Sequence, residues 1–308
     1  MIEFKHLTYG RIKQPLTVID ANVVIGGSCF LFGQSGSGKT TLLELICGLN
    51  CDNYYGEILF DGKPIGKTSI TYLPQSVVGL KGKSVLKNLQ YACKCANMPE
   101  GKIDRLDQWT SKFANVKLKK LSAFNKAYFA LVRASIKDAK FMLIDVCLDG
   151  FEDAEIKEYA SLLTQLLNNK NKQIILSISA DDFAKLNLVQ PNLQVLYMFA
   201  GKLTSYNNFN QFSNKPSILD VADYLNLPKT EAKVVSTING YLINIGSANY
   251  KLEANFANGI IKYFEVSDSA DVVLVGALPD DVNDSALNNL LQQGKVLLYD
   301  ALSRELLN

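Results

Sequence analysis

The sequence is short of histidine and of long apolar runs. His6 is the single histidine among 308 residues, and we interpret it as a partly exposed strand residue. No apolar run approaches the about 20 residues that a membrane-spanning helix needs. The first residues, MIEFKHLTYG, lack the basic-then-apolar pattern of a secretion signal. We therefore expect a cytoplasmic protein that reaches a membrane only through a partner.

A strong charge of one sign is also missing. The formal net charge is +2 and the pI is near 8.1, so a broad basic surface for nucleic acid is not expected. The densest basic run, KFANVKLKKL at 112–121, fits a solvated helix face. We predict no nucleic-acid partner.

Cysteine occurs without the spacing of a disulfide framework or a metal site. The cysteines stand among apolar residues at positions 29, 47, 51, 93, 95 and 147. Cys93 and Cys95 have neither histidine ligands nearby nor a second matching pair, so we interpret them as buried thiols rather than zinc ligands. Such usage is typical of a reducing compartment.

The N-terminal two thirds of the chain alternate between strand and helix patterns. Strands are expected at 28–32, 70–74, 140–145, 172–179 and 193–199, with a helix at 153–167. GEILFDGKPIG reads as two short strands around Asp61-Gly62. Alternation of this kind predicts an α/β domain with a mostly parallel sheet, placed at 1–212, with a helical lobe at about 78–139.

The C-terminal part has a different pattern of polar and apolar residues. After about Leu227-Pro228 the sequence turns to short alternating strands, including YLINIG, IIKYFEV and KVLLYDA. This pattern predicts a linker and a small all-β domain, a barrel or sandwich, within 213–308.

The segment GQSGSGKT, residues 33–40, matches the phosphate loop G-x-x-x-x-G-K-[ST] between a strand and a helix. Its glycines let backbone N–H groups face a phosphate, and the helix start adds partial positive charge. Lys39 would reach the β- and γ-phosphates and Thr40 would offer a hydroxyl to Mg²⁺. The predicted nucleotide contacts are Gly33, Gln34, Ser35, Gly36, Ser37, Gly38, Lys39, Thr40 and Thr41. Kinases and GTPases share this loop, so the loop alone names no function.

Further motifs, taken in order, resemble those of the ATP-binding cassette (ABC) ATPases that drive transporters. Tyr9 stands where the family stacks an aromatic ring on adenine, and Gln75 where a glutamine touches Mg²⁺ and the membrane subunit. LSAFN, with Ser122, replaces the LSGGQ signature that contacts ATP, and FMLID ends on the carboxylate motif residue, Asp145. The resemblance implies a P-loop (RecA-like) domain that binds ATP and Mg²⁺, the latter through Thr40, Gln75 and Asp145.

The tail is similar to that of the maltose-type sugar importer ATPases. The segments concerned are 200–229, 275–282 and 296–306, although Leu278 replaces an arginine expected before Pro279. The resemblance implies an OB-like regulatory domain and a carbohydrate or similar small solute. It also implies a dimer of ATPase subunits and transmembrane permease subunits, with this chain peripheral on the inner face of the cell membrane.

Three departures from the family bear on chemistry. Val146 occupies the position of the glutamate that polarises water, and Ala180 that of the switch histidine. Ala123 and Phe124 replace the signature glycines, and we expect Phe124 to crowd a partner's phosphate. No catalytic residue is then intact, and hydrolysis should be impaired.

These features favour a subunit that binds Mg-ATP with weak or absent hydrolysis and pairs with a different, intact ATPase. Two alternatives stay open: an active ABC-type ATPase that uses an unrecognised base, and a non-transport regulatory protein that binds ATP. Asp149 and Glu152 lie on the expected dimer-contact loop, so we do not expect either of them to serve as the base.

Overall fold

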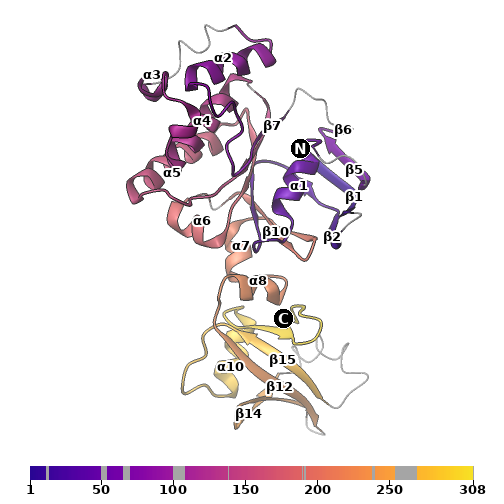
Figure 1. The fold of residues 1–308 in the computed structure, drawn as a ribbon. Coiled ribbons are helices and arrows are strands. Elements are labelled where there is room, and N and C mark those ends of the chain that lie inside the picture. The colour runs from indigo at the N-terminus through magenta and orange to yellow at the C-terminus, as the bar shows by residue number, and fades with distance from the viewer. Residues whose placement is uncertain are drawn as a thin grey trace. The chain divides into compact units, whose positions relative to one another are not determined.

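The computed structural model divides the chain into two compact units, drawn in Figure 1. Unit 1 is Met1–Asn207 and unit 2 is Asn208–Asn308, whereas the sequence places the boundary at 212/213. The residues that the structure describes are 1–11, 14–49, 54–64, 70–99, 108–137, 139–188, 190, 192–237, 240–253 and 269–307.

Unit 1 is built on one sheet in which antiparallel strands continue into a parallel group. The strands are β1 (Ile2–Arg11), β2 (Gln14–Ala21), β3 (Val24–Ile25), β4 (Cys29–Phe32), β5 (Tyr54–Phe60), β6 (Lys63–Pro64), β7 (Ile70–Leu73), β8 (Phe141–Asp145), β9 (Gln173–Ser177), β10 (Gln194–Phe199) and β11 (Lys202–Tyr206). Their order is β6-β5-β1-β2-β11-β10-β4-β9-β8-β7, with β3 paired to β1. Strands β10, β4, β9, β8 and β7 run parallel, as the sequence predicts.

The parallel strands are apolar because both faces of this part of the sheet are covered. β4, β8 and β9 are buried at every position. Since parallel strands end at the same edge, the residues after β4 and β7 meet the last residues of β8 and β9 there. This edge carries the candidate site.

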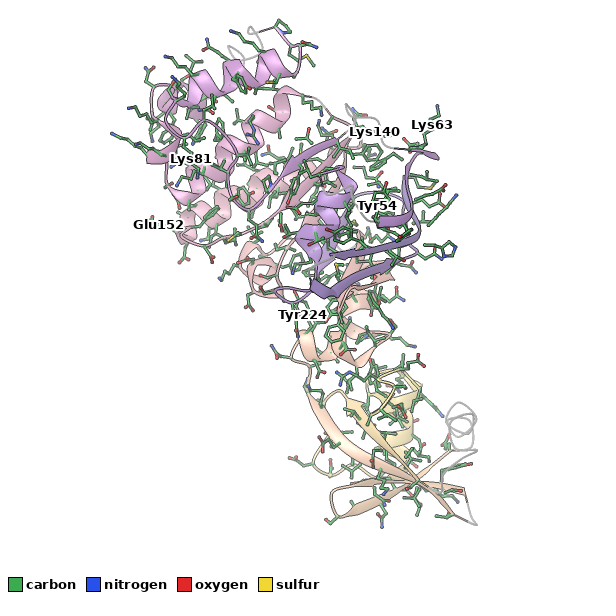
Figure 2. All side chains as sticks on the ribbon, turned by 45° about the vertical axis from the view of Figure 1, so that its right-hand side comes forward. Tyr54, Lys63, Lys81, Lys140, Glu152 and Tyr224 are labelled. Carbon is green, nitrogen blue, oxygen red and sulfur yellow. The ribbon has the colours of Figure 1, made fainter. Side chains whose placement is uncertain are left out.

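Helices surround the parallel strands. They are α1 (Lys39–Ile46), α2 (Val85–Cys95), α3 (Gln108–Phe113), the 3₁₀ turn η2 (Leu118–Lys120), α4 (Ala123–Ile136), α5 (Asp153–Leu167) and α6 (Ala180–Leu186). The segments α2, α3, η2 and α4 form the helical lobe, which Figure 1 shows apart from β1, β2, β5 and β6. In Figure 2, Lys81 and Glu152 lie on the lobe's side of unit 1, and Tyr54 and Lys63 on the side of the antiparallel strands.

Two local features of the antiparallel strands follow from the sequence. Asp61 and Gly62 have φ values of 49° and 76°, so they form the tight turn between β5 and β6. His6 is exposed in β1 at a break in register with β5, as expected of a strand residue. Gly56 faces this break, because a Cβ there would lie 2.4 Å from the His6 carbonyl oxygen.

Unit 2 packs helices against an antiparallel sheet. Its elements are α7 (Phe209–Asn214), α8 (Leu219–Tyr224), β12 (Lys229–Thr237), β13 (Gly240–Ile245), β14 (Ala248–Leu252), β15 (Ser269–Val275), α10 (Asp284–Gln292) and β16 (Leu297–Asp300). The strand order is β14-β13-β12-β15-β16. Its core includes Val234, Ile243, Leu274, Leu287 and Leu291, of which the last two come from α10.

The prediction of an all-β second domain is wrong, because α10 lies within it, whereas α8 and the end of α7 lie in the predicted linker. In α10, Leu287 and Leu291 are four residues apart and both buried, and the Asn283 side chain caps the helix by accepting from the Ala286 N–H at 2.9 Å. The sheet formed by the described strands is open, with β14 and β16 at its edges. The strand expected around IIKYFEV lies outside the described residues.

Candidate functional site

The phosphate loop has a backbone that its glycines make possible. A Cβ on Gly33 would lie 2.4 Å from the Met198 carbonyl oxygen in β10, so no larger residue fits there. Gly36 and Gly38 have φ values of 79° and 106°, which glycine adopts without steric cost. The Ser37 hydroxyl is buried and has no hydrogen-bond partner. An orphaned buried hydroxyl in this loop fits a phosphate oxygen that would complete it.

Lys39 begins α1 and folds back over the phosphate loop. Its Nζ donates to the carbonyl oxygens of Gly33 at 2.7 Å and Gln34 at 2.8 Å. Burial lowers the pKa of Lys39, and the nearby Asp145 charge opposes that shift. The first N–H groups of a helix lack intrahelical partners, so a positive helix end and a cation meet at this loop.

The outer positions of the predicted contact set are less enclosed. Gln34 and Ser35 are exposed at the loop surface, and Thr41 is half-buried in the first turn of α1. These placements leave the two ends of the loop open to a ligand.

Asp145 joins three segments of the sheet edge. It ends β8 and is 4% exposed. Thr40 Oγ1 donates to Oδ2 at 2.6 Å, and Ser177 Oγ donates to Oδ1 at 2.8 Å. Gln75 Nε2 lies 3.4 Å from Oδ1 as a weaker donor. The structure thus brings the predicted Thr40, Gln75 and Asp145 together.

These three side chains fit the predicted Mg²⁺. Hard cations prefer oxygen ligands, and Mg²⁺ is commonly held by one or two carboxylates with phosphate oxygens and water. Thr40 and Asp145 offer side-chain oxygens within this one network, and Gln75, which donates through Nε2 here, also carries an amide oxygen. In the described part of the chain, no group of three or more His, Cys, Asp or Glu residues could hold a metal alone. The donor set is therefore that of a nucleotide-bound cation rather than of a protein-enclosed one.

Tyr9 lies in the core of unit 1. It is 5% exposed and pairs with Tyr54 of β5 within the hydrophobic cluster of the antiparallel strands. A ring that stacks on adenine needs a free face. Adenine stacking by Tyr9 therefore stays a prediction that requires its ring to leave this packing.

Val146 and Ala180 stand at the two positions where the family resemblance predicts catalytic side chains. Val146 is 4% exposed, and its N–H donates to the Ser177 carbonyl oxygen at 2.9 Å. Ala180 is the half-buried first residue of α6, which Ser179 caps by accepting from the Asp182 N–H at 3.1 Å. Neither side chain can accept or donate a proton.

The segment LSAFN starts α4. Ser122 Oγ accepts from the backbone N–H of Asn125 at 3.2 Å and from its Nδ2 at 2.8 Å, so Ser122 caps the helix. Asn125 Oδ1 accepts from Trp109 Nε1 at 2.7 Å. The signature is therefore tied to α3 through a side-chain network. The Ser122 hydroxyl keeps its own proton for a ligand.

The expectation that Phe124 crowds a phosphate is wrong. Phe124 is 5% exposed and turns inward. Its ring meets Phe151 edge-on at 5.6 Å and Tyr128 at 6.0 Å between centroids. Apolar neighbours on α4 and after β8 draw the ring into the core, because burying a phenyl group is favourable by about 1.5–3 kcal/mol.

The segment DGFE, residues 149–152, lies beside the signature. A Cβ added to Gly150 would approach the Ala123 Cβ at 3.4 Å. Asp149 is exposed, and the Glu152 N–H donates to Glu155 Oε2 at 3.0 Å at the start of α5. Glu152 thus belongs to a helix cap, which weakens the idea that it serves as a base.

The loop after Gln75 is anchored to the helical lobe. Asn88 is buried, and its Oδ1 accepts from the Leu80 N–H at 2.7 Å. Arg133 Nη1 donates to the Val78 carbonyl oxygen. Gly79 packs so closely that a Cβ would lie 2.6 Å from Leu118 Cδ2. Movement of the lobe would therefore be transmitted to this loop.

Sequence reasoning missed Ser177 and Asn125. Ser177 is fully buried at the end of β9, directly beside Asp145 in the parallel register. A polar residue ending an apolar strand next to the carboxylate strand was the available signal. Asn125 offered no comparable signal, because its contact with Trp109 depends on how α3 and α4 pack.

Residues 16–148 match the protein-family model described as ABC transporter. The molybdate/tungstate import ATP-binding protein WtpC of Methanocaldococcus jannaschii is 26% identical over 220 residues, which is 68% of this chain and 71% of that protein. The sn-glycerol-3-phosphate import ATP-binding protein UgpC of Bordetella avium is 23% identical over 240 residues, covering 74% and 65%. The ATP-dependent lipid A-core flippase of Hahella chejuensis is 26% identical over 195 residues, covering 56% and 33%, so the chain spans about a third of that relative.

Solved structures agree on the fold of this region. The structure of cbiO1 from Clostridium perfringens, part of the ABC transporter complex cbiONQ, has a TM-score of 0.56 at 22% identity and covers 73% of this chain and 95% of its own. An ATP-binding subunit of an ABC transporter has a TM-score of 0.57 at 18% identity, covering 69% and 91%.

The fold and the phosphate loop define a P-loop α/β domain. The matched region, 16–148, contains the phosphate loop, Gln75 and Asp145, and its similarity is to ABC transporter ATP-binding proteins. None of the helices in the described residues has the length and apolar composition that crossing a membrane requires.

Proposed function

We propose that the chain is the ATP-binding subunit of an ABC importer, which binds Mg-ATP and hydrolyses it weakly or not at all. The observation that carries this proposal is the Asp145 network with Thr40 and Gln75, complete beside Val146. Bound Mg²⁺ would neutralise charge on the phosphates. The chain's own residues hold the nucleotide, and the groups that activate water are missing.

Binding rests on groups that are already in place. Lys39 can exchange its two carbonyl contacts for phosphate oxygens, which form stronger charge-assisted bonds. The Ser37 hydroxyl has no competing partner. The Thr40 hydroxyl already points to Asp145. Little reorganisation is then needed to bind ATP.

Hydrolysis needs groups that are missing from the expected positions. A positioned general base typically contributes 10²–10⁴-fold. Val146 is apolar and buried, and Ala180 has no titratable atom. Hydrolysis at this phosphate loop should therefore fall toward background.

The importer direction and the carbohydrate class rest on the tail and on the extent of the matches. Relatives named for import are matched over 71% and 65% of their length. The Rhizobium johnstonii β-(1→2)glucan export ATP-binding/permease protein NdvA is matched over 38% of its length. The larger share of the import proteins that is matched supports the importer direction, with permease subunits as the proposed partners on the inner face of the membrane. The tail at 200–308 favours a carbohydrate or similar small solute.

The partner is proposed to be a second, intact ATPase subunit. In the family arrangement each ATP lies between the phosphate loop of one chain and the signature of the other. A homodimer of this chain would carry Val146 and Ala180 in place of the glutamate and the histidine at both sites, so neither site would have a base. An intact partner would bring its own base to a site completed by Ser122 of this chain. Co-expression with neighbouring cassette and permease genes tests this, and assembly of the chain only with itself would contradict it.

The central test combines nucleotide binding with phosphate release. The purified chain should bind Mg-ATP and release phosphate at a background rate. Lys39→Ala removes a charge-assisted contact of about 1.5–3 kcal/mol, so the affinity should fall roughly 10- to 100-fold. Lys87→Ala, an exposed lysine on α2, is the matched control and should not change it. Turnover on the order of 1 s⁻¹ that disappears in Lys39→Ala would favour an active ATPase instead.

A further inference from the structure

A second pocket lies in unit 1, away from the phosphate loop. It has a volume of about 350 Å³ and opens between β7, α2 and α4. Its lining includes Thr71 from β7, Ala92, Cys95 and Ala96 from α2, and Arg133 and Ile136 from α4. Neither Asp145 nor any residue of the phosphate loop lines it. A volume of this size is at the lower end for small-molecule sites.

Arg133 brings an uncompensated positive charge to this pocket. It is half-buried, and burial lowers the pKa of its guanidinium. Nη1 donates to the Val78 carbonyl oxygen, and the guanidinium lies 5.8 Å from the Phe129 ring centroid. The ion pairs formed by the described residues do not include Arg133. A guanidinium has five N–H donors, so it retains capacity for an anion.

Thr71 supplies an independent sign of a missing ligand. Its hydroxyl oxygen is buried and has no hydrogen-bond partner. Buried polar atoms in folded proteins are nearly always paired, because an unpaired one costs about 1–3 kcal/mol. Thr71 and Arg133 line the same pocket from different elements. Lys137 adds a further positive charge to the lining and donates to the Ile70 carbonyl oxygen at 2.9 Å.

Most of the remaining lining is apolar, including Ala92, Ala96 and Ile136, and Tyr72 adds one further hydroxyl. We propose that this pocket binds a small organic carboxylate, with its carboxylate on Arg133 and Thr71 and its apolar body against the alanines. A planar guanidinium matches a carboxylate in a bidentate geometry. The apolar part of the pocket excludes a bare inorganic ion as the best occupant.

The ligand would act on the loop that carries Gln75. Arg133 holds Val78 of that loop, so carboxylate and loop share one guanidinium. Occupancy would redirect the guanidinium and thereby change how the loop is anchored. Through this contact, occupancy of the pocket could change the nucleotide site. Binding of the carboxylate does not depend on the proposed loss of ATPase activity.

Benzoate is a suitable probe, titrated into the full chain by calorimetry. Arg133→Gln removes a bond to a charged group, so benzoate affinity should fall about 10- to 100-fold. Thr71→Val keeps the shape and removes a neutral donor, so the fall should be about 2- to 10-fold. Lys126→Gln removes a positive charge from the same helix but does not line this pocket, and should leave the affinity unchanged. Inorganic phosphate should bind more weakly than benzoate.

A protection experiment in the unaltered chain avoids the risk of misfolded variants. Cys95 lines the pocket and is exposed, although the sequence was interpreted as burying it. Benzoate should slow alkylation of Cys95 by iodoacetamide several-fold, measured by mass spectrometry of the peptide. Cys147 lies outside this pocket and should react at an unchanged rate. Equal rates at Cys95 with and without benzoate, or no saturable heat of binding, would overturn the proposal. Tighter binding of phosphate than of benzoate would replace it with a simple oxyanion site.

Discussion

Ser177→Ala tests whether the Asp145 network is a functional unit. Ser177 is fully buried and its Oγ donates to Asp145 Oδ1 at 2.8 Å. Hydrogen bonds to charged groups contribute about 1.5–3 kcal/mol, compared with about 0.5–1.5 kcal/mol for neutral pairs. The free energy of unfolding should therefore fall by about 1.5–3 kcal/mol in urea denaturation. The carboxylate would also lose a positioning contact, so ATP affinity should depend less strongly on Mg²⁺.

Ser28→Ala is the matched control for this variant. Ser28 Oγ accepts from the Ile174 N–H at 3.0 Å in the same sheet, but the pair is neutral and only partly buried. Its loss should cost about 0.5–1.5 kcal/mol and leave the Mg²⁺ dependence of ATP affinity unchanged. If Ser177→Ala cost no more than Ser28→Ala, and the Mg²⁺ titrations coincided, Ser177 would be an ordinary core residue.

Three further changes have defined outcomes. Phe124→Ala should lower the free energy of unfolding by about 3–5 kcal/mol because the ring is buried, and a loss near zero in urea denaturation would contradict its inward packing. Residues 1–207 alone should fold and bind Mg-ATP with unchanged affinity, and calorimetry showing a folded fragment without binding would contradict the independence of unit 1. Lys140 and the Met1 amino group hold the pKa of Asp61 at about 2, below its usual value of about 3.9. This ion pairing stabilises the fold at pH values above about 3.9, and the stabilisation is lost as the pH falls toward 2. Asp61→Asn should therefore reduce the fall in melting temperature between about pH 4 and pH 2. Parallel curves of melting temperature against pH for the two proteins would refute this role of Asp61.

Features of the site that depend on chain order were accessible from the sequence. Parallel strands that end on Asp145, or run into Gln75 and the phosphate loop, must meet at one sheet edge once the strand order is β7-β8-β9-β4. Periodicity and motif spacing specify both the strands and their ends. The tight turn at Asp61-Gly62 was also readable, because few dipeptides adopt two positive φ values.

Features that depend on the direction of a side chain could not be predicted from the sequence. Phe124 replaces a glycine in the signature pattern, and nothing in its neighbours along the chain places Phe151 beneath it. Tyr9 matches an exposed position of the family, but cross-strand pairing with Tyr54 buries it. The helix α10 was overlooked because Leu287 and Leu291 stand among polar residues within a strand-rich region. The errors on Phe124 and on the all-β second domain come from tertiary packing that overrides a local pattern, whereas adenine stacking by Tyr9 stays a prediction.

The inward packing of Phe124 changes which departures from the family pattern limit ATP hydrolysis in the proposed dimer. If this ring projected from the signature, it would clash with the nucleotide on the partner's phosphate loop. Hydrolysis would then be impaired at both sites of a mixed dimer. Instead Ser122 caps an accessible helix start, while the ring lies in the core. Under the proposed function, the deficiency is then confined to the positions of Val146 and Ala180, which would affect only the nucleotide on this chain's own phosphate loop. A mixed dimer would accordingly keep one competent site, built from the partner's base and this chain's signature. Replacing Ser122 should therefore impair the partner's hydrolysis, whereas replacing Lys39 should impair nucleotide retention at this chain's own site.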